Sequence, residues 1–367
     1  MTIAVLYLAR CAEGLEPFRK FRESYRHHPA GIAHDLVVIY KGFTEPGALA
    51  DARAVFADTP HTGLELPDTG FDIGAYLAAA GMIAHDYVCC INTFTEILAE
   101  NWLAALHRHA SLPDVGIAGA TASYESMYES IRLLTRMVWL CREDRIPYDP
   151  RISAYFDFIL EQQCPAWKAN GLARLLRKRS PLSKLKALLI KRPHRHLKQR
   201  RRWPILRQQL QQRWDTYTQE GQPMARLLHF PRFPNPHIRS NGFLVRRKDL
   251  LDARRAPIDD KLDACEVESG ADSLTWQLRR RGLRAVLVDR HGTGYDVDGW
   301  WRSKTFRLGD QRDLLMADNR TRDYDSMTPE ARITHAVMSW GDYLMRPPRD
   351  FAKIGVTFAK DPAKTGG

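Results

Sequence analysis

The segment YVCCINTFTEIL, residues 87–98, changes from an apolar run to polar residues at Asn92 and Thr93. The unbroken apolar run before Asn92 is typical of a strand that is buried on both faces of a sheet. Asn is common at turns because it tolerates left-handed backbone and its side chain bonds to nearby backbone groups. Asn92 is therefore either a turn residue or a ligand-binding residue at the end of a buried strand.

Apolar runs of the same kind flank this segment on both sides. We predict strands at residues 3–8, 35–40, 86–91, 115–120 and 284–288, and helices at 14–26, 77–83 and 95–107. Buried strands that alternate with helices indicate a parallel α/β sheet. Ligands of such sheets bind beyond the carboxyl ends of the strands. The sequence places Arg10, Lys41, Asn92 and the loop 121–126 at these ends.

The second half of the chain returns to this pattern. Residues 237–246 (HIRSNGFLVR) predict a strand that follows a Pro-rich loop, and residues 266–282 predict a loop, a helix that begins near Ala271 and a Gly stop.

Composition favours a folded, reducing-compartment protein. Of the 367 residues 44% are hydrophobic, which is enough for a core and argues against wholesale disorder. The six cysteines show no zinc spacing, and adjacent Cys89 and Cys90 are expected as small core residues. The N-terminus lacks the charge order of a signal peptide, and no run reaches the roughly 20 apolar residues of a membrane span. We therefore expect a cytoplasmic protein that meets the inner membrane only peripherally.

The net charge of +12 comes from one segment, because residues 168–214 hold 16 Lys or Arg and no Asp or Glu. Leucines and isoleucines recur among these basic residues, and prolines interrupt them. We prefer a basic amphipathic insert that docks on an anionic membrane, where each basic residue contributes ~1 kcal/mol. A solvated basic face or a disordered arm is the alternative. Nucleic acid is an unfavoured partner, since regular aromatic interleaving and nucleic-acid motifs are missing.

Several motifs, taken in order, carry a resemblance to a known family. They are FDIGAY (71–76), INTFTEIL (91–98), WLAAL (102–106), VGIAGATASYES (115–126), FPNPHIRSNGFLVRR (233–247), ESGADSL (268–274) and ADNRT (317–321). In this set the chain resembles the GT-A nucleotide-sugar glycosyltransferases, and more narrowly the bacterial family 2-like and rhamnan-synthesis-related glycosyltransferase-like proteins. The resemblance covers most of the chain outside the basic segment.

The resemblance implies a fold and a domain plan. The fold is a GT-A (Rossmann-like) α/β fold, with a mixed, mainly parallel sheet flanked by helices and a basic helical insert. Residues 1–167 would form the nucleotide-sugar-binding half of the domain and residues 215–330 its acceptor-side half. The insert 168–214 would separate the two halves, and residues 331–367 would form a C-terminal tail.

One departure from the family concerns the metal. GT-A enzymes usually carry Asp-x-Asp after the central strand, and these carboxylates hold a divalent cation against the diphosphate. Here the position reads Asn92-Thr93-Phe94, which offers a carbonyl oxygen but no charge. A requirement for Mg²⁺ or Mn²⁺ is thus in doubt, with Asn92 and His291 as the candidate ligands. Basic side chains or a helix N-terminus are the alternative partners of the diphosphate.

The resemblance also implies roles for single residues. The expected nucleotide-sugar-binding residues are Arg10, Lys41, Asp72, Gly74, Asn92, Thr93, Arg239, Ser240 and Asn241. Asp72 is equally well explained as a helix N-cap, and Gly74 would let backbone approach the ligand.

Glu268 is the expected catalytic base, because inverting transfer needs a carboxylate within hydrogen-bond reach of the acceptor hydroxyl. Glu266 and Asp272 are its rivals, and all three are also explained as residues that favour a helix N-terminus.

The function implied is transfer of a hexose or deoxyhexose from a nucleotide diphosphate sugar to a surface polysaccharide or lipid-linked acceptor. The alternative is a non-catalytic relative that binds a nucleotide sugar or a glycan. Expected partners are the nucleotide sugar, the glycan or lipid-linked acceptor, and the anionic membrane surface.

Overall fold

A computed structural model of the protein describes residues 1–129, 226–253 and 257–341. The chain divides into two compact units, Met1–Ser126 with Pro231–Gly367, and Met127–Phe230. The basic segment 168–214 belongs to the second unit and lies outside the described residues. The one regular element described in that unit is the 3-10 helix η3 (Leu227–His229). All candidate site residues belong to the first unit.

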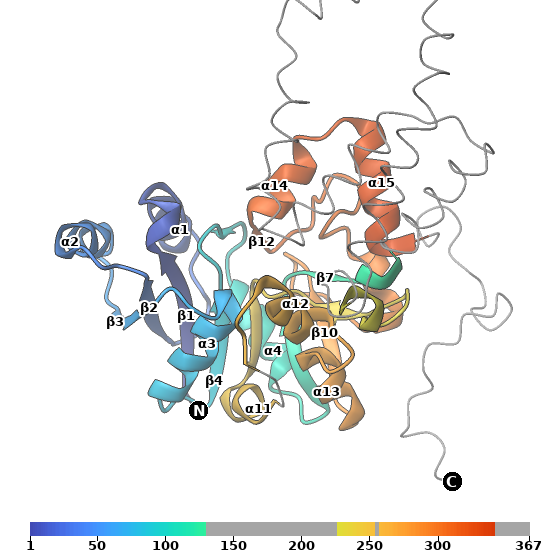
Figure 1. The fold of residues 1–367 in the computed structure, drawn as a ribbon, viewed down its shortest axis with the longest axis horizontal. Helices are drawn as coiled ribbons and strands as arrows, with labels where there is room; N and C mark the ends of the chain where they lie inside the picture. The colour runs from blue at the N-terminus through green and yellow to red at the C-terminus, as the bar shows by residue number, and fades with distance from the viewer. Residues whose placement is uncertain (130–225, 254–256, 342–367) are drawn as a thin grey trace, which may run out of the picture. The chain divides into compact units, whose positions relative to one another are not determined.

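The first unit is built on an eight-stranded sheet with the strand order β11-β10-β6-β9-β4-β1-β2-β3 (Figure 1). The neighbouring pairs among β1 to β4 are parallel, as is the pair of β6 and β10, whereas β9 runs antiparallel between β4 and β6. The predicted fold class, a mixed and mainly parallel α/β sheet flanked by helices, is confirmed. The strands are β1 (Ile3–Arg10), β2 (Asp35–Lys41), β3 (Thr62–Leu66), β4 (Tyr87–Ile91), β6 (Val115–Gly119), β9 (Phe243–Arg246), β10 (Arg284–Val288) and β11 (Gly294–Tyr295).

Helices cover both faces of this sheet because its central strands are apolar on both sides. One face packs against α1 (Glu16–His27), α2 (Pro46–Val55) and α4 (Trp102–Ala110). The other packs against α3 (Phe71–Met82), α11 (Arg247–Asp252) and α13 (Leu274–Arg280). Cys89 contributes to the first core and Cys90 to the second, which confirms both as core residues.

Shorter elements surround the carboxyl edge of the sheet. β5 (Glu96–Ile97) pairs with β12 (Met316–Ala317), and β7 (Ala122–Ser123) pairs with β8 (His237–Ile238). The helices α12 (Lys261–Ser269), α14 (Asn319–Asp325) and α15 (Pro329–Trp340) and the 3-10 helices η1 (Cys11–Glu13) and η4 (Val297–Arg302) complete the unit. α15 covers the first part of the expected tail and buries Trp340 in the core.

Several predicted elements differ in extent from those observed. The predicted helix 95–107 begins only at Trp102, because Glu96 and Ile97 pair with β12 instead. The predicted strand 237–246 is two short strands, β8 and β9, separated by a turn in which Gly242 has a φ of 69°. Between β2 and α3, where no element was predicted, the structure has α2 and β3. In the parts of the chain that the structure describes, no helix combines the length and the apolar character needed to cross a membrane.

Candidate functional site

The ends of β1 and β2 carry two of the predicted cations, and both are paired with Asp68. Arg10 contacts the two Asp68 carboxylate oxygens at 2.9 and 2.8 Å, and it also contacts Glu13 at 3.0 Å. Lys41 lies 3.4 Å from Asp68 and donates to the Phe71 carbonyl at 2.7 Å. The Lys41 side chain is 2% exposed, so it is enclosed by these partners. Arg10 and Lys41 therefore fasten the loop after β3 to the ends of β1 and β2.

The electrostatics of this group follow from burial and pairing. Burial lowers the pKa of Lys41, and the carboxylate of Asp68 opposes that shift. The hydrogen bond from Arg10 holds the pKa of Asp68 below its ordinary value. Asp68 is thus an anion between two cations, and a bound phosphate would have to displace it to reach Lys41.

Asp72 is not the N-cap that the sequence also allowed. The N-cap position of α3 is Gly70, with a φ of 71°, and Asp72 follows in the first turn. A Cβ at Gly70 would lie 3.0 Å from the Cα of Gly74, so both glycines belong to a tight helix start. Burial raises the pKa of Asp72, and Lys261 and Lys41 oppose that shift. The Asp72 carboxyl is thus influenced both by Lys41 at the end of β2 and by Lys261 at the start of α12.

Asn92 is a turn residue in this structure. Its side-chain oxygen accepts from the backbone N–H of Phe94 at 3.0 Å and lies 3.0 Å from the Thr95 hydroxyl, whose single proton has a shorter contact to Asn241. The hydrogen bond to Phe94 gives this oxygen a partner within its own turn, so the turn accounts for Asn92. Thr93 is 3% exposed, and its backbone carbonyl accepts from the Tyr7 hydroxyl at 2.9 Å.

Asn241 joins the two halves of the chain at the centre of the sheet edge. Its side-chain oxygen accepts from the backbone N–H of Asn92 at 3.0 Å and from the Thr95 hydroxyl at 2.7 Å. Because both donors lie on the oxygen, the orientation of the amide is fixed by its neighbours. Its NH₂ group is buried, and no protein atom among the described residues accepts from it. An oriented buried donor of this kind is costly unless a ligand or water accepts from it.

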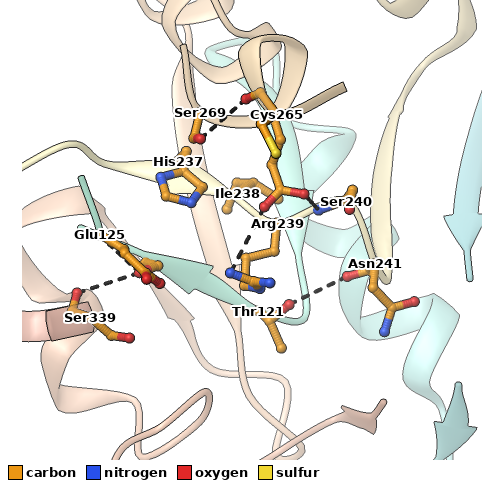
Figure 2. A network of polar contacts seen from close by, with 12 residues as sticks. Thr121, Glu125, His237, Ile238, Arg239, Ser240, Asn241, Cys265, Ser269 and Ser339 are labelled. Atoms are coloured by element: carbon orange, nitrogen blue, oxygen red, sulfur yellow. Dashed lines mark hydrogen bonds and ion pairs between the residues drawn. The ribbon is translucent and has the colours of Figure 1, made fainter. Parts of the chain in front are cut away.

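Glu268 lies beside Arg239 and Ser240 in the same region. Figure 2 shows His237, Arg239, Ser240 and Asn241 along one segment, with Cys265 and Ser269 of α12 above it and Thr121 below it. Glu268 accepts from the Ser240 N–H at 3.2 Å and lies 3.8 Å from Arg239. It belongs to the last turn of α12, not to the start of α13, so a helix N-terminus does not explain it.

The positive groups around Glu268 determine its charge. Burial opposes ionisation, but Arg239, His237 and the Ser240 N–H together lower the pKa of Glu268 to about 2. The carboxylate is therefore ionised throughout the physiological range and, without a ligand, is a weak base.

Two further residues beside Glu268 were not selected from the sequence. Lys261, at the start of α12, is exposed, lies 5.6 Å from the centre of the Phe71 ring, and adds its charge to Asp72 and Glu268. Among the described residues it has no ion-pair partner. His237 is 2% exposed and donates from Nδ1 to the Asn235 carbonyl at 2.8 Å, while burial lowers its pKa. The capping box formed by Asp260 and Asp263 is a sequence signal for the start of α12, and Lys261 is the first residue of this helix.

The described residues offer no dedicated metal centre. Across residues 1–129, 226–253 and 257–341, no group of three His, Cys, Asp or Glu side chains could hold an ion. His291 is exposed on the turn between β10 and β11, and its side chain contacts Asp313 at 3.4 Å. Asn92 and His291, the predicted ligands, are thus in separate surroundings and do not fit a shared ion.

Comparisons with known proteins gave structural neighbours only. No protein-family model and no curated protein matches the chain. One solved structure is a mannosyltransferase from Pyrobaculum calidifontis with GDP-Man and Mn²⁺, at 15% identity and a TM-score of 0.28, covering 36% of this chain and 38% of that one. Another is glucosyl-3-phosphoglycerate synthase from Mycobacterium tuberculosis with Mn²⁺, UDP and phosphoglyceric acid, at 14% and 0.26, covering 38% and 48%.

A third neighbour is a CMP:2-keto-3-deoxy-manno-octonic acid synthetase with CTP, at 10% identity and a TM-score of 0.26, covering 35% of this chain and 56% of that one. The chain thus covers between 38% and 56% of the length of these three structures. With such low scores, and with a different enzyme class among them, these neighbours do not identify an activity.

Proposed function

We propose that the protein is a glycosyltransferase of the GT-A type, which binds a nucleotide diphosphate sugar at the carboxyl edge of its sheet. The observation that carries the proposal is the junction of Asn92, Asn241 and Glu268. Strand ends from the first half of the chain meet the β8–β9 turn and α12 of the second half there, and Asn241 presents an oriented donor from which no atom of the described residues accepts. A phosphate or sugar oxygen is a suitable acceptor for this donor.

Charge on the diphosphate would be met by Lys261, which is exposed and without an ion-pair partner in the described part of the chain. Arg10 and Lys41 were predicted to bind the nucleotide sugar, but they hold Asp68 at shorter distances. We therefore assign them the support of the loop before α3.

Glu268 would take the proton of the acceptor hydroxyl. The hydroxyl oxygen forms a bond to the anomeric carbon, the bond from that carbon to the diphosphate oxygen breaks with its electron pair, and the proton passes to Glu268. A pKa of about 2 does not suit a base. A bound diphosphate would compete for the charge of Lys261 and would add negative charge nearby, and both effects raise the pKa of Glu268.

A divalent cation is compatible with this proposal if the diphosphate supplies most of its ligands. Mg²⁺ commonly binds with one or two protein carboxylates together with substrate phosphates. Asp72 is the carboxylate of the site that could assist, since Glu268 takes the acceptor proton, and a bound cation would shield charge on the departing diphosphate.

A non-catalytic nucleotide-sugar or glycan-binding protein is the second candidate. It is favoured by the missing Asp-x-Asp and by the low pKa of Glu268. The two candidates differ in turnover and not in donor binding.

A thermal-shift screen with UDP-, GDP- and dTDP-sugars, with and without Mn²⁺ or Mg²⁺, tests the proposal. A ligand at a hundred times its Kd stabilises the folded state by about 2.7 kcal/mol. We expect one nucleotide class to raise the melting temperature, and release of the nucleoside diphosphate to reveal turnover. Binding of a nucleotide sugar without release of the nucleoside diphosphate would favour the non-catalytic candidate. No shift with any nucleotide sugar would contradict both the glycosyltransferase and a nucleotide-sugar-binding protein, and would leave only glycan binding.

The variant Asn241→Asp keeps the oxygen that accepts from Asn92 and Thr95 but replaces the NH₂ group with a charged oxygen. We expect at least a tenfold loss of donor affinity, because the unpartnered donor becomes an anion. Ser111→Asp is the matched control, since it adds the same charge in the turn before β6, at the opposite edge of the sheet.

Membrane docking remains a proposal from the sequence of residues 168–214. We propose that this segment holds the enzyme at an anionic surface, near a lipid-linked acceptor. Deletion of residues 168–214 should abolish co-sedimentation with anionic vesicles at low salt. Unchanged co-sedimentation would contradict the docking role.

A further inference from the structure

A second group of cations lies beyond Glu268, around the ring of Phe306. The guanidinium carbon of Arg239 lies 4.2 Å from the ring centre and that of Arg307 lies 4.8 Å from it. The ring is fully buried, and the side chains of Arg239 and Arg307 are 17% and 11% exposed. Two guanidinium groups are therefore held close together in a largely dry place, where their charges are costly without anions.

The backbone at Arg307 is held in an uncommon conformation. Its φ is 50°, a left-handed value that few side chains adopt without cost. The Arg307 N–H donates to the side-chain oxygen of Gln311 at 2.8 Å. The side-chain nitrogen of Gln311 donates to the Thr321 carbonyl and to Asp325, both in α14. Contacts through Gln311 to α14 thus hold the Arg307 backbone in this conformation. Backbone strain of this kind is concentrated at functional sites.

The protein satisfies Arg307 only in part. One guanidinium nitrogen lies 3.3 Å from Glu125 and 3.5 Å from the Ser339 hydroxyl, while Nε is buried and no described protein atom accepts from it. The neighbouring His335 has a buried Nδ1 that is also without a partner in the described residues. Burial lowers the pKa of Arg307; Glu125 opposes that shift, and Arg239 and Arg320 add to it.

The position of this group relates it to the acceptor. Arg10 and Lys41 end β1 and β2, on one side of the central pair β4 and β9. Arg239 follows β8, which pairs with β7, the strand that comes after β6 on the other side. Arg239 also touches Glu268, so an anion bound by the arginines would sit next to the proposed base.

We infer that Arg239 and Arg307 form a subsite for an oxyanion, a phosphate or carboxylate, carried by the acceptor. This inference rests on the proposed function and names the class of acceptor. Guanidinium groups suit it, since they bind such oxyanions through paired N–H donors. The anion would accept from the buried Nε of Arg307 and place the attacking hydroxyl near Glu268.

Calorimetric titration of the full chain with glucose 6-phosphate, glucuronate and glucose tests the subsite, and UDP is the probe for the donor. We expect the two anionic sugars to bind at least tenfold tighter than glucose. Arg307→Gln should remove this preference while UDP affinity stays within twofold. Arg312→Gln, an exposed arginine of the same loop, is the matched control and should change neither.

Three results would overturn the inference. They are equal affinity for glucose and glucose 6-phosphate, retained preference in a folded Arg307→Gln protein, and displacement of glucose 6-phosphate by UDP, which would assign the arginines to the donor diphosphate. If Arg307→Gln does not fold, Arg239→Gln is used in the same way. Absence of any nucleotide-sugar binding would contradict the proposed function, whereas the glucose 6-phosphate preference would still test the arginines.

Discussion

The two cationic groups at the carboxyl edge of the sheet differ in how completely the protein satisfies them. Arg10 and Lys41 share Asp68, with Arg10 at hydrogen-bond distance from both carboxylate oxygens. Arg239 and Arg307 lie 3.8 and 3.3 Å from their carboxylates, and Arg307 has one buried donor from which no atom in the described part of the chain accepts. In the sequence Arg10, Lys41 and Arg239 look alike, as basic residues near the ends of strands.

This difference in pairing separates cations that stabilise the fold from cations that can bind a ligand. A buried cation that is fully paired contributes to folding, because removing its partner leaves an uncompensated charge. A cation with loose pairs and spare donors can accept an anion at lower cost. The first group, Arg10 and Lys41 with Asp68, therefore stabilises the fold. We assign ligand binding to the second group, Arg239 and Arg307, and to Lys261. Four changes test this division.

The largest effect is expected for Glu268→Gln. Removal of a general base typically lowers the rate by about 10²–10⁴-fold. Glu266→Gln, on the same helix, is the matched control and should keep activity within about twofold. Full activity of Glu268→Gln in a donor-turnover assay would remove Glu268 as the base.

Asp68→Ala should act on stability. It leaves the buried Lys41 with the Phe71 carbonyl alone, and we expect the free energy of unfolding to fall by about 2–3 kcal/mol in chemical denaturation. Asp58→Ala removes an exposed partner of Arg22 and Arg26 and should cost less than about 1 kcal/mol. If the two variants were equally stable, the first group would not stabilise the fold.

Acid should weaken the folded state through Glu268. Its folded pKa of about 2 lies below its ordinary value, so its contribution is present above about pH 4.3 and is lost as the pH falls toward 2. Between pH 7 and pH 3, the stability advantage of the wild type over Glu268→Gln should shrink by about 1.5 kcal/mol. A difference that stays constant over this range would show that Glu268 is not held ionised.

The smallest effect is expected for the contact between Thr95 and Asn241. Thr95→Val removes the hydroxyl that donates to Asn241 at 2.7 Å and should cost about 1 kcal/mol of unfolding free energy. Thr121→Val is the matched control, because its hydroxyl lies 3.4 Å from the Asn241 carbonyl, which is long for a hydrogen bond. Equal costs would mean that the orientation of Asn241 does not depend on Thr95.

The central sheet was largely predictable because its strands are short apolar runs. Runs that begin at Ile3 and Asp35 became β1 and β2 within two residues of their predicted ends. β3 was missed because it alternates and is mostly exposed, with Gly63 at its second position. Without β3, the partner of Lys41 could not be found, since Asp68 lies 27 residues further on and reaches Lys41 only through strand pairing.

The site was less predictable because its contacts are long-range. Asn92 and Asn241 are 149 residues apart, and they meet because β9 inserts antiparallel beside β4. α12 lacks a clear apolar stripe, so residues near Glu268 were assigned to a loop. Arg307 carries no local signal at all: its role depends on the Phe306 ring, the Gln311 contact and a strained φ that only the fold defines.

The most direct test follows the side-chain amide of Asn241 by NMR. In ¹⁵N-labelled protein, the two NH₂ signals that vanish in Asn241→Asp belong to this residue. On addition of the nucleotide sugar that stabilises the protein, we predict that these signals shift, while the amide signals of Asn101, at the start of α4, do not. Donor binding that leaves the Asn241 signals unchanged would show that the nucleotide sugar binds elsewhere and would contradict the proposed site.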